Sequence, residues 1–219
     1  MMRIEELLET RVQKTPEKPF LTFSDARFTY EETAETAKRY ANALAELGVQ
    51  PGNRVGLFLP NCPEFLFCLF ANAYLDSVTA PSNPEYQPAE LEHSIDLSTP
   101  DVLVTTPELL DTATEAAGGT SVEQILLTEA TDTHESLPAL AADQPAEIGP
   151  HDGDAETVGL HMYTSGTTGP PKAVECQHEN WTISAIDFQK RMGFTFEDTL
   201  FTALPLFHAN AQIYSTLGA

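Results

Sequence analysis

Residues 158–172 read VGLHMYTSGTTGPPK, an apolar run followed at once by hydroxyl residues, glycines, two prolines and a lysine. The apolar half, 158–164, has the β-branched and aromatic content of a short, mostly buried strand. The polar half concentrates hydrogen-bond donors and flexible backbone in a few residues, which is typical of a loop. The stretch therefore predicts a strand that ends in a tight polar loop.

Strands and helices alternate along the rest of the chain. Further short apolar runs predict strands at 20–23, 54–60, 101–106, 123–129 and 199–205. Helical spacing of apolar residues predicts helices at 29–48, 63–76 and 88–98, and another that starts near residue 208. Residues 130–157 lack periodicity and are interpreted as a surface loop. This alternation predicts an α/β fold with a mixed, mainly parallel sheet flanked by helices.

The composition is that of an acidic globular protein. The 219 residues are 42% apolar, with 33 acidic against 11 basic residues and a formal charge of −22. Such a surface argues against nucleic acid or an anionic membrane as a partner. Because concentrated salt screens repulsion between carboxylates, the charge predicts a halophilic protein, and an acidic protein of ordinary cytoplasm is the alternative. No signal peptide or membrane-length apolar run is present, so a cytoplasmic location is expected.

No metal site or disulfide framework is predicted. The three cysteines are odd in number and lack CxxC spacing. The acidic stretch HDGD at 151–154 is interpreted as a loop rather than a metal site. The histidines without ligand spacing are His93, His134, His151 and His161.

The polar loop has the chemistry of a phosphate-binding site. Glycine lets the backbone approach a ligand, and N–H and O–H donors in a turn form a nest for anionic oxygens. Lys172 is the first basic residue after Arg54 and supplies a cation. The spacing is not the Walker pattern, because two residues separate Gly166 from Gly169 and Ala173 follows the lysine. The alternative is a polar turn that binds nothing. The predicted phosphate-binding residues are Thr164, Ser165, Gly166, Thr167, Thr168, Gly169 and Lys172.

Two motifs carry a resemblance to a known family. TSGTTGPPKAV at 164–174, followed by His178, resembles the phosphate-binding signature of the AMP-forming, adenylate-forming enzymes, which include acyl-CoA synthetases, adenylation domains and luciferases. Family members usually carry glycine at Ala173, a departure expected to affect packing rather than chemistry. LPLFHANAQ at 204–212 resembles the family's acyl-pocket segment, and 54–61 and 80–86 fit its N-terminal subdomain. The resemblance covers the whole chain.

The resemblance implies a reaction in two steps. A carboxylate attacks the α-phosphate of ATP to give an acyl-adenylate, and the thiol of coenzyme A then displaces AMP. It implies ATP, Mg²⁺ and CoA, with the residue that contacts the metal outside this chain. It also implies His208 as a catalytic residue beside the carboxylate, although a histidine that caps the next helix is the alternative. The implied substrate contacts are Phe207, His208, Asn210 and Gln212, and His178 is expected to be structural.

Later family motifs are absent from the sequence. These are the Tyr-Gly-x-Thr-Glu segment, the ribose-binding Asp, the hinge and the C-terminal lid with its catalytic Lys. Residues 1–219 are therefore expected to form a partial N-terminal AMP-binding domain, with the phosphate loop at 163–172 and the acyl-pocket segment at 204–212. Little activity is expected from this piece without a second chain that supplies the missing motifs. The alternatives are a non-catalytic ATP-binding subunit and an adenylation domain that delivers to a carrier protein.

Overall fold

The computed structural model describes residues 2–149, 153–164 and 172–219, which contain a mainly parallel sheet. In the described residues this sheet has six strands in the order β6-β5-β3-β4-β7-β8, and only β8 runs antiparallel to its neighbour. The α/β class predicted from the sequence is confirmed. The strands are β3 (Arg54–Phe58), β4 (Val78–Pro81), β5 (Val102–Thr105), β6 (Gln124–Leu127), β7 (Val158–Thr164) and β8 (Lys172–Gln177).

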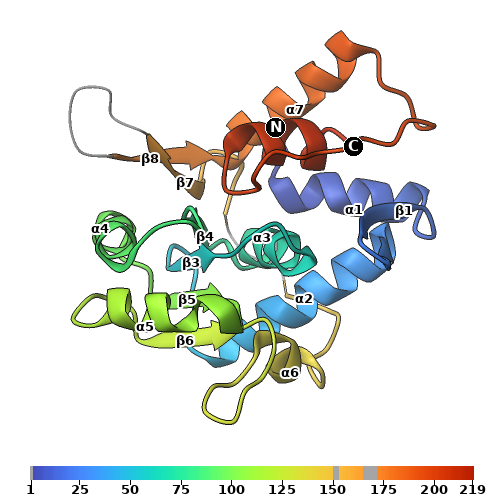
Figure 1. Cartoon of the computed structure of the whole chain (residues 1–219). Coiled ribbons are helices and arrows are strands. Elements are labelled where there is room, and N and C mark those ends of the chain that lie inside the picture. Colours follow the sequence, from blue (N-terminus) through green and yellow to red (C-terminus); the bar gives the residue numbers. More distant parts are fainter. Residues whose placement is uncertain (1, 150–152, 165–171) are drawn as a thin grey trace.

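Helices cover both faces of the sheet, as Figure 1 shows. Alternate residues of β5 point to opposite faces, so Val102 and Val104 join one apolar cluster and Leu103 joins the other. One face carries α1 (Ile4–Lys14), α2 (Tyr30–Glu46), α3 (Pro63–Leu75) and α6 (Leu137–Ala141). The other carries α4 (Pro88–Ser98), η1 (Pro107–Leu109) and α5 (Leu110–Ala117).

The remaining elements lie beside α1. The hairpin of β1 (Pro19–Phe23) and β2 (Ala26–Thr29) forms a separate two-stranded sheet. Helix α7 (His178–Met192) packs against the π-helical segment η2 (Ala211–Leu217), and α1 contacts α7. Thus the N-terminal and C-terminal parts of the chain meet on one side of the sheet (Figure 1).

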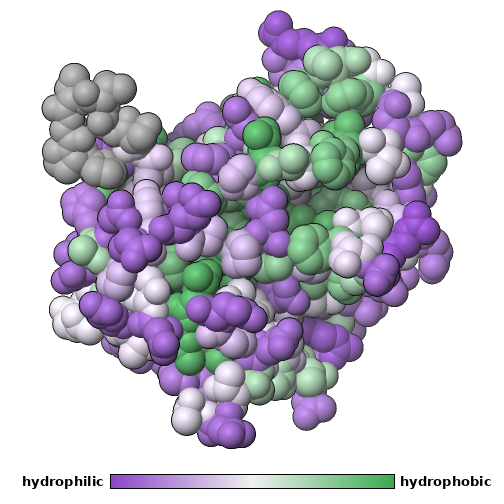
Figure 2. Space-filling view, in the orientation of Figure 1, coloured by the Kyte–Doolittle hydropathy of each residue, from purple (hydrophilic) through white to green (hydrophobic). Residues whose placement is uncertain are grey.

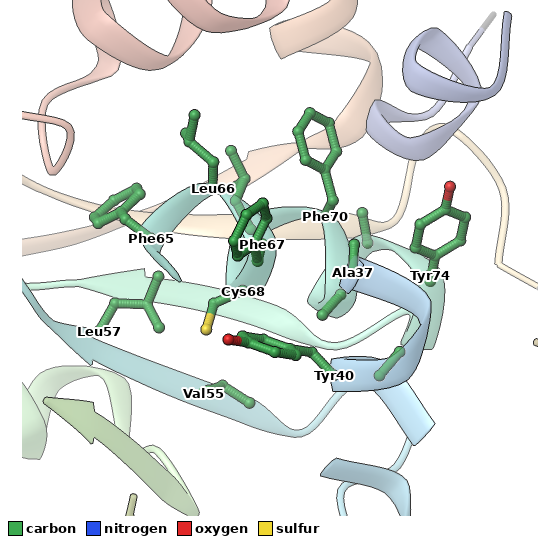
Figure 3. Packing of buried hydrophobic residues seen from close by; sticks show 14 of the residues in the cluster. Ala37, Tyr40, Val55, Leu57, Phe65, Leu66, Phe67, Cys68, Phe70 and Tyr74 are labelled. Carbon is green, nitrogen blue, oxygen red and sulfur yellow. The ribbon is translucent and has the colours of Figure 1, made fainter. Parts of the chain in front are cut away.

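Helix α3 is the centre of the larger core. Its sequence PEFLFCLFANAYL is apolar all round because the helix is enclosed, with β3 on one side and α2 on another (Figure 3). The rings of Tyr40 and Phe67 meet edge to face, with 5.9 Å between their centroids. Pro63 opens the helix and Asp76 closes it in the left-handed conformation, with φ of 55°. The predicted buried helix at 63–76 is confirmed.

Two sequence-based predictions are wrong. Residues 199–205 form no strand. Phe201 is 90% exposed, and the Asn61 side chain bonds to the Leu204 carbonyl oxygen and to the N–H of the following Leu206. The stretch 130–157 is not wholly loop, because α6 begins after Ser136, whose hydroxyl accepts a hydrogen bond from the Ala139 N–H. A short amphipathic turn of this length gives too little periodicity to be found in the sequence.

The face drawn in Figure 2 is largely hydrophilic. Figure 2 shows purple side chains over much of one face and green, apolar residues gathered in a hollow near its upper right. Large exposed apolar side chains concentrate late in the chain, at Ile183, Met192, Phe196, Phe201, Leu204 and Tyr214. Among the described residues, no helix is both long and apolar enough to cross a membrane.

Candidate functional site

The polar loop connects β7 to β8, the antiparallel strand at the edge of the sheet. Thr164 ends β7 and Lys172 begins β8, and these two residues are register partners at the end of the hairpin next to the loop. Both side chains are exposed, and the Thr164 hydroxyl lies 3.5 Å from the Lys172 carbonyl oxygen. In Figure 1 the hairpin extends beyond the body of the sheet. Five predicted phosphate-binding residues lie outside the described residues: Ser165, Gly166, Thr167, Thr168 and Gly169.

The base of this hairpin is fixed by His178, the first residue of α7. Its ring is fully buried, and the Arg3 guanidinium lies 3.1 Å from its Nε2. Arg3 also forms ion pairs with Glu5 at 2.6 Å and Asp76 at 2.7 Å. A Cβ atom at Gly159 in β7 would lie only 2.8 Å from Nε2 of His178, so the close approach of strand and ring requires glycine. The structural role expected of His178 agrees with this position.

A cavity of about 880 Å³ opens beside the hairpin. Its position at the carboxyl ends of β4 and β7 is where open α/β sheets bind ligands. Among the described residues that line it, Glu90 is the only carboxylate and none is lysine or arginine. The cavity is therefore suited to an organic group, while the hairpin end with Lys172 is suited to anions. The lining residues are Pro81, Asn83, Tyr86, Ala89, Glu90, His93, Ser94, Leu97, Tyr163, Thr164, Phe207 and His208.

Buried hydrogen bonds support the wall of this cavity. The Tyr163 hydroxyl lies 2.7 Å from Ser98 Oγ and 3.1 Å from the Ser94 carbonyl oxygen, and burial raises its pKa. Ser98 Oγ also lies 3.0 Å from Nδ1 of His161. Burial lowers the pKa of His161, the charge of Arg54 lowers it further, and Glu175 opposes the shift. This network ties β7 to α4, the helix that forms one wall.

The acyl-pocket segment contributes two of its four predicted contacts to the cavity. Phe207 and His208 line it, with their ring centroids 4.1 Å apart. They also line a second cavity of about 400 Å³, whose other walls include Asn83 and Pro60. Asn210 is exposed and lines neither cavity.

Gln212 has a different place from the one expected. Its side chain is fully buried, its Oε1 accepts a hydrogen bond of 3.1 Å from the Trp181 indole, and its Nε2 donates one of 2.8 Å to the Leu206 carbonyl oxygen. Both ends of the amide are thus bonded within the protein, so Gln212 supports the segment rather than facing the cavity.

Sequence reasoning missed several residues of this site. Tyr163 lay in the quoted motif but was assigned no role, and Asn83 and His93 carry no recognisable spacing. His93 also lines the cavity, and its buried Nε2 has no hydrogen-bond partner within the part of the chain that the structure describes. In the described residues, no group of three or more His, Cys, Asp and Glu is arranged to hold a metal, and all three cysteines are free thiols.

The sequence of the chain matches one family model along nearly its whole length. The model of the AMP-binding enzyme family matches residues 8–219. The chain belongs to the AMP-binding enzyme family. It is 31% identical over 209 residues to a medium/long-chain-fatty-acid–CoA ligase, FadD6, of Mycobacterium tuberculosis, with 94% of this chain and 34% of the relative aligned. It is 32% identical to a feruloyl-CoA synthase of Amycolatopsis, with 92% and 38% aligned.

Solved structures of AMP-binding enzymes share the fold. The N-terminal domain of FACL13 from Mycobacterium tuberculosis superposes with a TM-score of 0.87 and 26% identity, over 100% of this chain and 55% of that one. MbtA of Mycobacterium smegmatis superposes with a TM-score of 0.90 and 26% identity, over 99% of this chain and 41% of that one. The chain thus has the N-terminal part of the family fold, and it spans 34% and 38% of the two curated relatives described above.

Proposed function

We propose that this chain contributes the phosphate-binding and part of the acid-binding machinery for AMP-forming ligation of a carboxylic acid to coenzyme A. The observation that carries the proposal is that Thr164, at the start of the polar loop, and His208 line the same cavity. Thr164 and His208 are 44 residues apart in sequence and meet only in the fold. The similarity to acyl-CoA ligases supports the same reaction class.

The chemistry follows from the charges of the two places. In the first step a carboxylate oxygen bonds to the α-phosphorus of ATP and the bond to pyrophosphate breaks. Negative charge grows on the leaving group, where the loop donors Thr164 to Gly169 and the Lys172 ammonium would stabilise it. His208 would orient the carboxylate, with Phe207 against its apolar part. In the second step the CoA sulfur bonds to the acyl carbon and AMP leaves.

No cluster of Mg²⁺ ligands is found among the described residues. Mg²⁺ would enter with ATP, whose phosphates it neutralises, but the described part of the chain offers no cluster of metal ligands. Because the chain spans little more than a third of these two relatives, we propose slow turnover by these 219 residues alone. An ATP-binding subunit that works with a second chain is the other candidate. The location we propose is the cytoplasm, where ATP and CoA are both present.

Calorimetric titration with Mg·ATP tests the phosphate site. Lys172→Ala is expected to weaken binding about tenfold or more, because a hydrogen bond to a charged group contributes roughly 1.5–3 kcal/mol. Lys190→Ala is the matched control, since Lys190 lies in the last turn of α7 on another part of the surface. Equal affinities for the two variants, or no binding by the unmodified chain, would refute the site.

Release of AMP tests the reaction. The chain is mixed with ATP, CoA and a panel of aliphatic and aromatic acids, and AMP is measured. Bound nucleotide without AMP release is the expected result for the chain alone. Rapid turnover would contradict the proposal that these residues are slow by themselves, while supporting the reaction class.

A further inference from the structure

The segment that carries Phe207 and His208 is held by side chains rather than by secondary structure. It contains no strand, although its composition favours one. The Leu206 N–H donates a hydrogen bond of 2.7 Å to Oδ1 of Asn61, and Nδ2 of Asn61 donates one of 3.0 Å to the Leu204 carbonyl oxygen. A single amide side chain thus replaces the partner strand for this stretch of backbone.

Gln212 holds the carbonyl group of Leu206, on the other side of that residue from Asn61. Its Nε2 donates to the Leu206 carbonyl oxygen, and its Oε1 accepts from the indole of Trp181, so the orientation of the amide is fixed. Gln212 is fully buried and Trp181 is 6% exposed, so both bonds of the amide lie away from bulk solvent. Both polar backbone groups of Leu206 therefore bond to side-chain amides that come from different parts of the chain.

We infer that Asn61 and Gln212 are positioning residues that clamp Leu206 and thereby set the place of Phe207 and His208. The clamp transmits to the pair because the His208 N–H bonds to the Pro205 carbonyl oxygen at 3.0 Å, which closes a turn around Leu206. Phe207 and His208 stand between the two cavities of about 880 and 400 Å³ and line both. A small rotation of this turn would alter the shape of both cavities.

This inference rests on the proposed function only where it predicts an effect of the clamp on binding of a carboxylic acid. The position of His208 can be measured without ligand, because the Phe207 ring at 4.1 Å shifts the resonances of the imidazole protons. The ring signals of the six histidines are recorded by proton–carbon NMR, and His208→Gln identifies the one that matters. Mg·ATP affinity is measured separately by calorimetry, since the phosphate site lies at the hairpin.

The variants remove one part of the clamp at a time. Asn61→Ala removes both bonds of Asn61, while Asn61→Asp keeps the acceptor for Leu206. Gln212→Met keeps the volume without the polar atoms. Trp181→Phe removes only the indole donor and is the mild variant if Gln212→Met fails to fold. Asn42→Ala is the matched control, because Nδ2 of Asn42 also donates to two distant carbonyl oxygens, of Pro145 and Glu147, each at 2.8 Å.

The clamp predicts that Asn61→Ala and Gln212→Met move the His208 signals and that Asn42→Ala does not. It also predicts weaker binding of benzoate or octanoate, about fivefold, the factor that one ordinary hydrogen bond represents, with Mg·ATP affinity unchanged. Unmoved His208 signals in Asn61→Ala, Asn61→Asp and Trp181→Phe would overturn the inference. If no acid binds to any variant but the signals move, the clamp is supported and the proposed acid site is refuted.

Discussion

Replacing Gly159 with alanine is expected to destabilise the chain by about 2 kcal/mol. The added Cβ would lie 2.8 Å from Nε2 and 2.9 Å from Cδ2 of His178, closer than non-bonded atoms normally approach. The ring has little room to retreat, because it is fully buried and Arg3 Nη2 lies 3.1 Å from it. Extra volume in a packed interior costs roughly 1–3 kcal/mol. For a chain of this size, 2 kcal/mol corresponds to a drop in Tm of about 4–8 °C.

Urea unfolding followed by the fluorescence of Trp181 measures the effect. Trp181 is the sole tryptophan and lies in α7, the helix that begins at His178. Gly149→Ala is the control, since a Cβ at Gly149 would have no atom of the described residues within 4 Å apart from its neighbours in the chain. The contact itself is tested in the His178→Ala background, where Gly159→Ala should cost much less. The reasoning is refuted if Gly159→Ala and Gly149→Ala differ by less than about 0.5 kcal/mol.

Three further predictions concern charge. The pKa of His161 is lowered in the folded state below its usual 6.5, so the unfolded chain binds the proton more readily. The free energy of unfolding should therefore fall as pH drops from 7 through the folded pKa. Urea unfolding at several pH values measures this dependence, and the part due to His161 should disappear in His161→Gln. Arg3→Met should lower the free energy of unfolding by about 3–5 kcal/mol, because it leaves Glu5 and Asp76 without their buried cation. Thermal unfolding measures the loss, and Arg191→Met is the control, since the ion pair of Arg191 is exposed. With a charge of −22, the chain should melt at a higher temperature in multimolar KCl than in dilute buffer, since the Debye length is only about 3 Å at 1 M, and no gain with salt would count against a halophilic origin.

The sequence predicted those parts of the fold whose signals are local. Helix α3 was found because Pro63 and an unbroken apolar run mark a buried helix, and β7 was found because its apolar residues stop at a polar loop. β8 was missed because its sequence, KAVECQ, has mostly exposed or half-buried residues and no continuous apolar face. The hairpin supplies its register, with Thr164 opposite Lys172, and that pairing is not encoded in the composition of the strand.

The strand wrongly predicted at 199–205 and the part of the proposed acid-binding site that the sequence did not predict have the same physical cause. An apolar run forms a strand only if a partner strand bonds to its backbone N–H and carbonyl groups. Here the side chain of Asn61, 145 residues away from Leu206, makes some of these bonds instead. The proposed phosphate loop could be predicted because its hydrogen-bond donors are consecutive in the chain. The cavity could not be predicted, because its walls come from residues 81–97, 163–164 and 207–208, which lie far apart in the sequence. The residues that hold the last of these segments, Asn61 and Gln212, come from two further places in the chain. Gln212 shows the consequence: proximity in sequence to His208 suggested a substrate contact, whereas its bonds to Leu206 and Trp181 make it part of the frame.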